Sequence, residues 1–134
     1  MDVNLSRHNR RMSERVNVAS ESVYESAVGY SRAVRVGRHI AVAGTTGSGD
    51  DIAAQTRDAL RRIEAALSEV GATLRDVVRT RIYVTDIAKW LDVAAVHAEA
   101  FGDIKPVATM VEVSALIDPA LQVEIEADAY ASES

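Results

Sequence analysis

The chain has no cysteine, no long apolar run and no excess of basic residues. Without cysteine it forms no disulfide framework, no thiolate nucleophile and no cysteine metal site. No apolar run approaches the roughly 20 residues needed to cross a bilayer, and the first five residues do not have the apolar core of a secretory signal. We therefore expect a cytoplasmic protein with no membrane partner.

The charge balance is acidic, with 15 basic residues, 20 acidic residues and a net charge of −5. A broad surface for nucleic acid needs clustered lysine and arginine to neutralise phosphates. Here the basic residues are scattered, apart from a local group at Arg7, Arg10 and Arg11. We therefore expect no nucleic-acid partner.

That basic group lies in a polar segment without periodicity, which predicts a disordered leader over residues 1–13. A natural start at Met12, after an upstream start codon, explains the same segment equally well. The rest of the 134-residue chain, residues 14–131, has the length and the apolar content of one globular domain.

Two kinds of hydrophobic periodicity follow one another along this domain. Alternating or β-branched segments predict five strands, at 31–36, 39–43, 77–85, 108–113 and 122–130. Apolar residues spaced three and four apart predict two helices, at 52–70 and 86–101. Asp50 or Asp51 caps the first helix and Gly71 ends it. The order β-β-α-β-α-β-β predicts an α+β domain, with one mixed sheet and both helices on one face.

Two helices leave the other face of such a sheet uncovered. The strands at 77–85 and 122–130 carry apolar residues on both faces, so self-association through the second face is expected. A single-layer sheet with a polar outer face is the alternative. Trp90 falls on the apolar stripe of the helix at 86–101 and is expected in the core.

A glycine-rich loop over residues 44–50 invites comparison with a phosphate-binding loop. That motif requires Gly-x-x-x-x-Gly-Lys, because the lysine neutralises phosphate charge. Here Asp50 follows Gly49, and an acid repels phosphate, so nucleotide binding is not expected. The backbone N–H groups of Gly44 and Thr45 remain able to hold a small anion.

Few side chains have the spacing of a metal or catalytic site. The three histidines show no His-x-x-x-His spacing, so we expect no metal site, and no motif calls for a cofactor. Glu124 and Glu126 are two residues apart on one strand, so both point to the same face. Two like charges there favour proton uptake by one of them. The pair is the best acid–base candidate, with a solvated edge face as the alternative.

Several stretches of the chain resemble the Rid (YjgF-type) family, in the family's order: Gly29–Gly37, Val42–Gly44, Gln55–Leu60, Val70–Val78 and Val123–Ala127. The resemblance covers nearly all of residues 29–129. It implies a chorismate-mutase-like fold and a homotrimer whose clefts between subunits bind small carboxylate or keto-acid ligands. Active members hydrolyse enamines and imines such as 2-aminoacrylate to 2-keto acids and ammonia.

The resemblance also assigns roles to particular residues. Tyr30 matches the cleft tyrosine, Gly44 the glycine whose backbone lines the pocket, and Glu124 the acid that acts on the attacking water. The family arginine belongs to a Pro-Ala-Arg-Ser pattern, and Ala108 occupies its place here, two residues before Met110.

A second substitution weakens the same cleft, because Ala94 replaces the family's asparagine. Arg81, on a central strand, is a candidate replacement cation that would bind a carboxylate with its planar fork. Pairing of Arg81 with Glu124 or Glu126 is the alternative.

Three functions follow from this comparison. The first is a small-carboxylate binder without standard deaminase activity, and the second is an enamine or imine deaminase or other hydrolase with different substrate anchors. The third is a protein-interaction or chaperone-like role. The endoribonuclease and translation-inhibitor labels attached to the family gain no support from an acidic chain without an aromatic–basic pattern.

Overall fold

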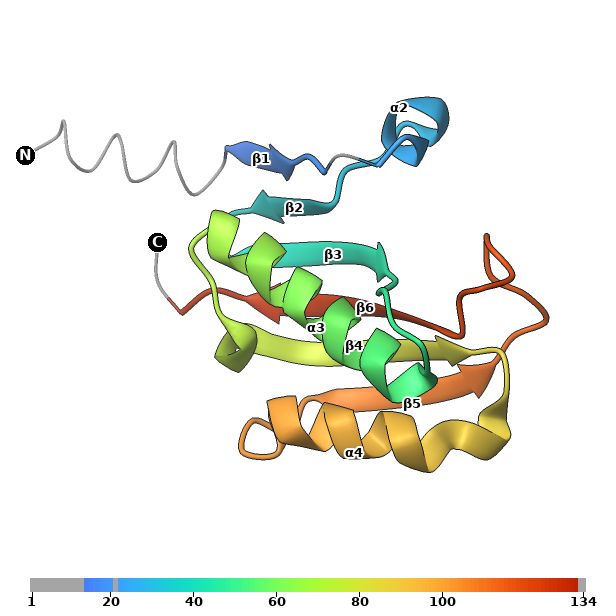
Figure 1. The fold of residues 1–134 in the computed structure, drawn as a ribbon. Helices are drawn as coiled ribbons and strands as arrows, with labels where there is room; N and C mark the ends of the chain where they lie inside the picture. The colour runs from blue at the N-terminus through green and yellow to red at the C-terminus, as the bar shows by residue number, and fades with distance from the viewer. Residues whose placement is uncertain (1–13, 21, 133–134) are drawn as a thin grey trace, which may run out of the picture.

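The computed structural model describes residues 14–20 and 22–132, so the predicted leader at 1–13 lies outside the described residues. Strands, α-helices and 3-10 turns alternate along the chain (Figure 1). They are β1 (Arg15–Val18), α2 (Tyr24–Val28), β2 (Ala33–Val36), β3 (His39–Thr45), α3 (Ile52–Glu69), η1 (Leu74–Asp76), β4 (Val77–Val84), η2 (Ile87–Lys89), α4 (Trp90–Phe101), β5 (Val107–Glu112) and β6 (Val123–Tyr130).

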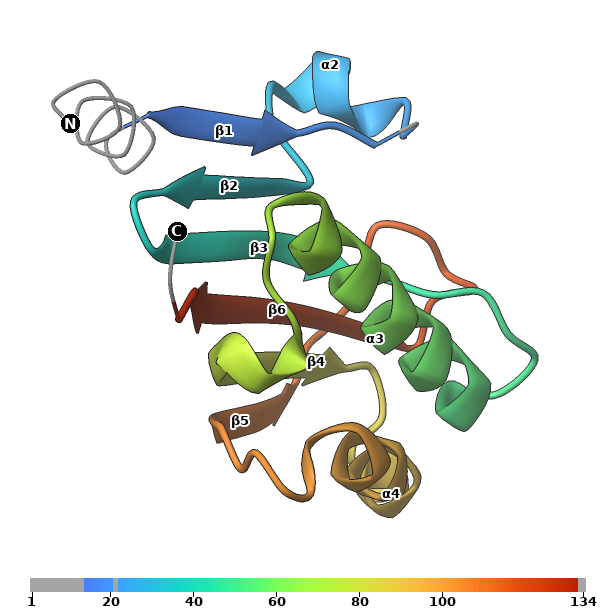
Figure 2. The same ribbon diagram turned by 90° about the vertical axis from the view of Figure 1, so that its left-hand side faces the viewer.

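These strands form one six-stranded sheet in the order β1-β2-β3-β6-β4-β5. Neighbours are antiparallel except β4 and β5, which are parallel and are connected through α4. Both long helices, α3 and α4, lie on the same face of the sheet (Figure 2). The predicted α+β fold is confirmed, including the mixed sheet and the single helical layer.

One strand and one α-helix, β1 and α2, were not predicted, and neither were the 3-10 turns η1 and η2, of which η2 occupies the start of the helix predicted at 86–101. β1 has four residues and is an edge strand that pairs only with β2 among the described strands. α2 has five residues and no buried side chain, and it ends at Gly29, whose φ of 87° is left-handed. Elements this short contain too few residues to show a hydrophobic period. The neighbouring strand and the turn glycine set their positions instead.

The predicted ends of α3 agree with the structure. Asp51 caps the helix by accepting a hydrogen bond from the backbone N–H of Ala54 at 2.8 Å. Gly71 follows the last turn with a left-handed φ of 80°, as a glycine after a helix C-terminus commonly does. No helix in the described part of the chain is both long enough and apolar enough to cross a membrane.

The core lies between the helices and the sheet. Buried residues of β6 alternate with half-buried acids, so that Val123 and Ile125 face the helices while Glu124 and Glu126 lie on the opposite face. Phe101 of α4 is fully buried in this layer. The prediction that Trp90 belongs to the core is wrong, because 49% of its surface is exposed. Trp90 is the first residue of α4, whose buried side chains are Val93, Val96 and Phe101.

Candidate functional site

A surface cleft of about 1060 Å³ opens beside the end of β3. Its walls come from the segment around α2, from one side of α3 and from the loop before β6. Three predicted site residues line it together: Tyr30, Gly44 and Glu124. They come from distant parts of the chain, and the sheet brings them together because β3 pairs with β6.

Glu124 is a carboxyl group of this cleft whose pKa is shifted by its surroundings. It is half-buried on β6, and burial raises the pKa of its carboxyl above the usual value. The negative charge of Glu126 raises it further, while the positive charge of Arg32 acts in the opposite direction. A carboxyl with a raised pKa keeps its proton to a higher pH than an ordinary carboxyl does.

Gly44 lies against Glu124 because β3 is irregular at this point. The β3–β6 register shifts between Val42 and Thr45, and a side chain at position 44 would overlap the Glu124 carboxylate, with Glu124 Cδ only 3.0 Å from the added carbon. The carbonyl oxygen of Gly44 accepts a hydrogen bond from Arg32 Nη2 at 2.8 Å. Glycine at this position therefore leaves room for the carboxyl group.

The glycine-rich loop after Gly44 packs tightly on α3. A side-chain carbon at Gly47 would come within 2.6 Å of the Ala59 backbone nitrogen, and one at Gly49 within 2.6 Å of Ala54 Cβ. These glycines therefore allow the loop to approach the helix. This close approach accounts for the glycines at 47 and 49 without a phosphate ligand.

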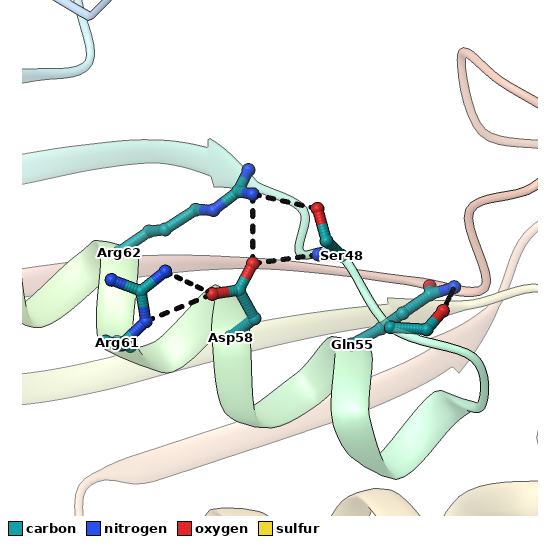
Figure 3. A network of polar contacts seen from close by, with 6 residues as sticks. Ser48, Gln55, Asp58, Arg61 and Arg62 are labelled. Atoms are coloured by element: carbon teal, nitrogen blue, oxygen red, sulfur yellow. Dashed lines mark hydrogen bonds and ion pairs between the residues drawn. The ribbon is translucent and has the colours of Figure 1, made fainter.

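A polar network fixes that loop to the helix (Figure 3). The Asp58 carboxylate accepts hydrogen bonds from the backbone N–H of Ser48 at 2.8 Å and from Arg61, and it pairs with Arg62 at 2.9 Å. These contacts, the Ser48 bond first, lower the pKa of Asp58 despite its partial burial. The loop is thereby held by hydrogen bonds and ion pairs at one rim of the cleft.

Buried Gln55 connects α3 to both loops at this end of the sheet. Its Nε2 donates to the carbonyl oxygens of Gly49 at 3.2 Å and Ala120 at 3.1 Å, and its Oε1 accepts from the backbone N–H of Gln122 at 2.8 Å. The segment before β6, which lines the cleft, is thus tied to the glycine-rich loop.

Arg81 lies in a different cluster, on the sheet face opposite the helices. Its Nη1 is 3.6 Å from Glu126 and 3.4 Å from Asp128, and the Tyr83 hydroxyl donates to Glu126 at 2.7 Å. This hydrogen bond, with burial, raises the pKa of Tyr83. Arg81 pairs across the strands as the alternative interpretation expected. It does not line the cleft, and ligand binding by Arg81 stays a prediction.

The remaining predicted residues do not line the cleft of the same chain. Thr45 is buried, with its hydroxyl donating to the Ala43 carbonyl at 2.7 Å. Ala108 and Met110 are on the edge strand β5, opposite Thr80 and Ile82 of β4. The structure of one chain therefore brings Tyr30, Gly44 and Glu124 together in one cleft and leaves Ala108 and Met110 outside it.

Arg32 is the cleft residue that sequence reasoning missed. It immediately precedes β2, half-buried, and it lines the cleft beside Gly44. In the sequence it looks like an ordinary polar residue of an alternating strand. Its position two residues after Tyr30 was the available signal, because alternate residues of an extended chain point to the same side.

The fold and the cleft define a small α+β protein with a half-buried carboxyl group in a surface cleft. The family model described as Endoribonuclease L-PSP matches residues 20–131. The chain therefore belongs to this family, which also carries the names YjgF and RutC, and the family resemblance noted in the sequence is confirmed.

Individual relatives agree with this assignment. The crystal structure of Rv2704 from Mycobacterium tuberculosis, of the YjgF/YER057c/UK114 family, is 73% identical, with a TM-score of 0.86 over 87% of this chain and 99% of that one. A RutC family protein of Pyrococcus abyssi is 40% identical over 75% of this chain and 85% of its own length. The 3-aminoacrylate deaminase RutC of Acinetobacter baylyi is 36% identical over 60% of this chain and 63% of its own.

The raised pKa of Glu124 predicts a pH-dependent stability difference. A carboxyl that binds its proton more tightly when folded contributes stability below its usual pKa of 4.5, and that contribution is lost as pH rises through the folded value. We expect Glu124→Gln to become progressively more stable than the wild type as pH increases from 4.5. Urea denaturation at several pH values and one protein concentration measures this.

The matched control is Glu64→Gln, at an exposed position on α3. Its stability difference from the wild type should not follow the pH trend of Glu124→Gln. A constant difference between Glu124→Gln and the wild type across the same pH range would show that burial does not perturb Glu124.

Proposed function

We propose that this protein binds small carboxylate or keto-acid metabolites in clefts between the subunits of a homotrimer, without standard 2-aminoacrylate deaminase activity. The observation that carries the proposal is the arrangement of Glu124 against Gly44 in a cleft that also contains Tyr30 and a cationic side chain, Arg32. Acid, hydroxyl and cation around one cleft suit a small polar anion better than an apolar molecule.

Binding in this cleft predicts sensitivity to a single methyl group at Gly44. In Gly44→Ala the added carbon overlaps the Glu124 carboxylate and displaces it into the cleft. We expect 2-oxobutyrate and benzoate to bind the wild type and to bind Gly44→Ala at least about tenfold more weakly, since one methyl group in a pocket has an effect of this order. Calorimetric titration measures the affinities. Equal affinity in a folded Gly44→Ala variant would place the ligand elsewhere.

Assembly into a trimer is supported by the face of the sheet that the helices leave uncovered. On β5, Val107 and Val111 are 59% and 42% exposed, and they lie opposite Arg79 and Tyr83 of β4. Val36 of β2 is 43% exposed. Apolar side chains interleaved with paired charges are typical of a surface that associates with another copy.

A homotrimer should have about three times the 14.4 kDa mass of one chain in light scattering at micromolar concentration. Val111→Asp, which adds an unpaired charge to the proposed interface, should reduce that mass. Val23→Asp is the control, because Val23 immediately precedes α2 and is 78% exposed. This substitution should leave the mass unchanged. A stable wild-type monomer would contradict both the assembly and a cleft built between subunits.

Weak deaminase activity is expected because Ala108 replaces the arginine that holds the substrate carboxylate in active members. Charge-assisted hydrogen bonds contribute about 1.5–3 kcal/mol each, so the loss of a bidentate pair costs roughly 3 kcal/mol. That corresponds to about a hundredfold lower kcat/KM than in an arginine-containing relative. The assay is keto-acid release from freshly generated 2-aminoacrylate.

In the same assay Ala108→Arg should recover part of the activity, whereas Ala98→Arg, which adds the same charge at an exposed position on α4, should not. Wild-type turnover equal to that of the arginine-containing relative would instead favour the second candidate function, an active enamine or imine deaminase with other anchors. The retention of Glu124, half-buried and with a raised pKa, is the observation that favours this candidate.

A further inference from the structure

Three arginines line the cleft, and they differ in their partners. Arg61 and Arg62 both pair with Asp58, and Arg62 also donates to the Ser48 hydroxyl at 3.1 Å (Figure 3). Among the residues that the structure describes, no carboxylate oxygen lies within 4.0 Å of the Arg32 guanidinium. Arg32 therefore brings a charge to the cleft that no described ion pair neutralises.

The hydrogen bonds of Arg32 are also incomplete. Its Nη2 donates to the Gly44 carbonyl oxygen at 2.8 Å, while its Nε is buried without a hydrogen-bond partner. A buried donor of a charged group that lacks an acceptor is costly, so such a group in a native protein calls for an explanation. The side chain as a whole is only half-buried, and Arg32 lines the cleft.

We propose that Arg32, which immediately precedes β2, binds the carboxylate of the cleft ligand. It would thereby provide the anchor that is absent at Ala108. The inference rests on the proposed function, because it names the group that recognises the ligand. An arginine fork matches the two oxygens of a carboxylate, and its attraction is strong where water is partly excluded.

Gly44 sets the spacing between this anchor and the acid–base group. Its carbonyl oxygen accepts the Arg32 hydrogen bond, and its α-carbon faces the Glu124 carboxylate. A carboxylate held by Arg32 therefore has its adjacent carbon atoms close to Glu124. This arrangement favours short carboxylic acids with a polar carbon next to the carboxylate, such as 2-oxo and 2-imino acids.

Charge in the cleft supports the same assignment. Glu124 and its neighbour Glu126 repel an anionic ligand; Arg81 pairs with Glu126, and Arg32 is the cation whose charge acts on Glu124. Without Arg32, an anion would enter a half-buried site beside Glu124 with no cation acting on that acid. Arg32 therefore distinguishes an anionic ligand from a neutral ligand of the same shape.

The test compares benzoate with benzamide, which have nearly the same shape and differ in charge. We expect the wild type to prefer benzoate, and Arg32→Met to bind benzoate at least about tenfold more weakly while its benzamide affinity changes by less than about twofold. Unchanged benzamide binding shows that the cleft is intact. Arg32→Lys, which keeps the charge and loses the fork, should give an intermediate preference for benzoate.

Arg35→Met is the matched control. Arg35 is half-buried on β2 and donates to the backbone carbonyls of Gly37 at 2.8 Å and Val70 at 2.6 Å, but it does not line the cleft. Its substitution should leave the ratio of benzoate to benzamide affinity unchanged.

The possible failures are distinguishable. If Arg32→Met keeps the wild-type preference for benzoate, the assignment of Arg32 is wrong and the proposed binding function stands. If Arg81→Met removes the preference and Arg32→Met does not, Arg81 is the anchor. If the wild type binds neither benzoate nor 2-oxobutyrate, the proposed function fails, and the role of Arg32 fails with it.

Discussion

The position of β6 at the centre of the sheet is the constraint on which the site depends. This last strand of the chain pairs with β3 on one side and β4 on the other, so its backbone is held along both edges. Because successive residues of a strand point to opposite faces, burial of Val123 and Ile125 against the helices fixes Glu124 and Glu126 on the other face. A shift of one residue would reverse both sets.

The acids of β6 have different surroundings: two of them form ion pairs, and Glu124 does not pair with any described residue. Glu126 and Asp128 lie within 4 Å of Arg81, and Glu126 also accepts the Tyr83 hydrogen bond. Glu124 forms no ion pair with any described residue, and burial dominates its protonation. Carboxyl groups with this kind of perturbation in a cleft are candidates for function rather than stability.

The segments that form the walls of the cleft are held to the rest of the protein to different extents. On one side Gln55 and Asp58 of α3 hold both the glycine-rich loop and the segment before β6 through hydrogen bonds. On the other side the five-residue α2 buries no side chain, and few buried contacts imply lower local stability. A ligand would therefore meet a fixed wall that carries Glu124 and Gly44 and a more adaptable one near Tyr30.

Elements with enough residues to show a hydrophobic period could be predicted from the sequence. The alternation in β4 and β6, the apolar spacing of α3 and its cap at Asp51 all reflect local geometry, so they were readable without coordinates. The pairing of Glu124 with Gly44 in one cleft came from the family resemblance, because nothing in the spacing of residues 80 apart places them together. Trp90 shows the limit of periodicity, because it shares the spacing of the apolar stripe of α4 and is nevertheless half exposed.

Which charged residues line the cleft and which pair with one another depends on the packing of strands that are distant in the sequence. Arg32 and Arg81 look alike in the sequence, each an arginine in an extended segment. Arg81 neighbours β6 at the level of Glu126 and is paired with acids there. Arg32 instead lies beside β3 near its register shift and donates to the Gly44 carbonyl, with no acid among the described residues as its partner. The pairing of strands distant in sequence makes that distinction, because an ion pair depends on which side chains the sheet sets within a few ångströms of each other.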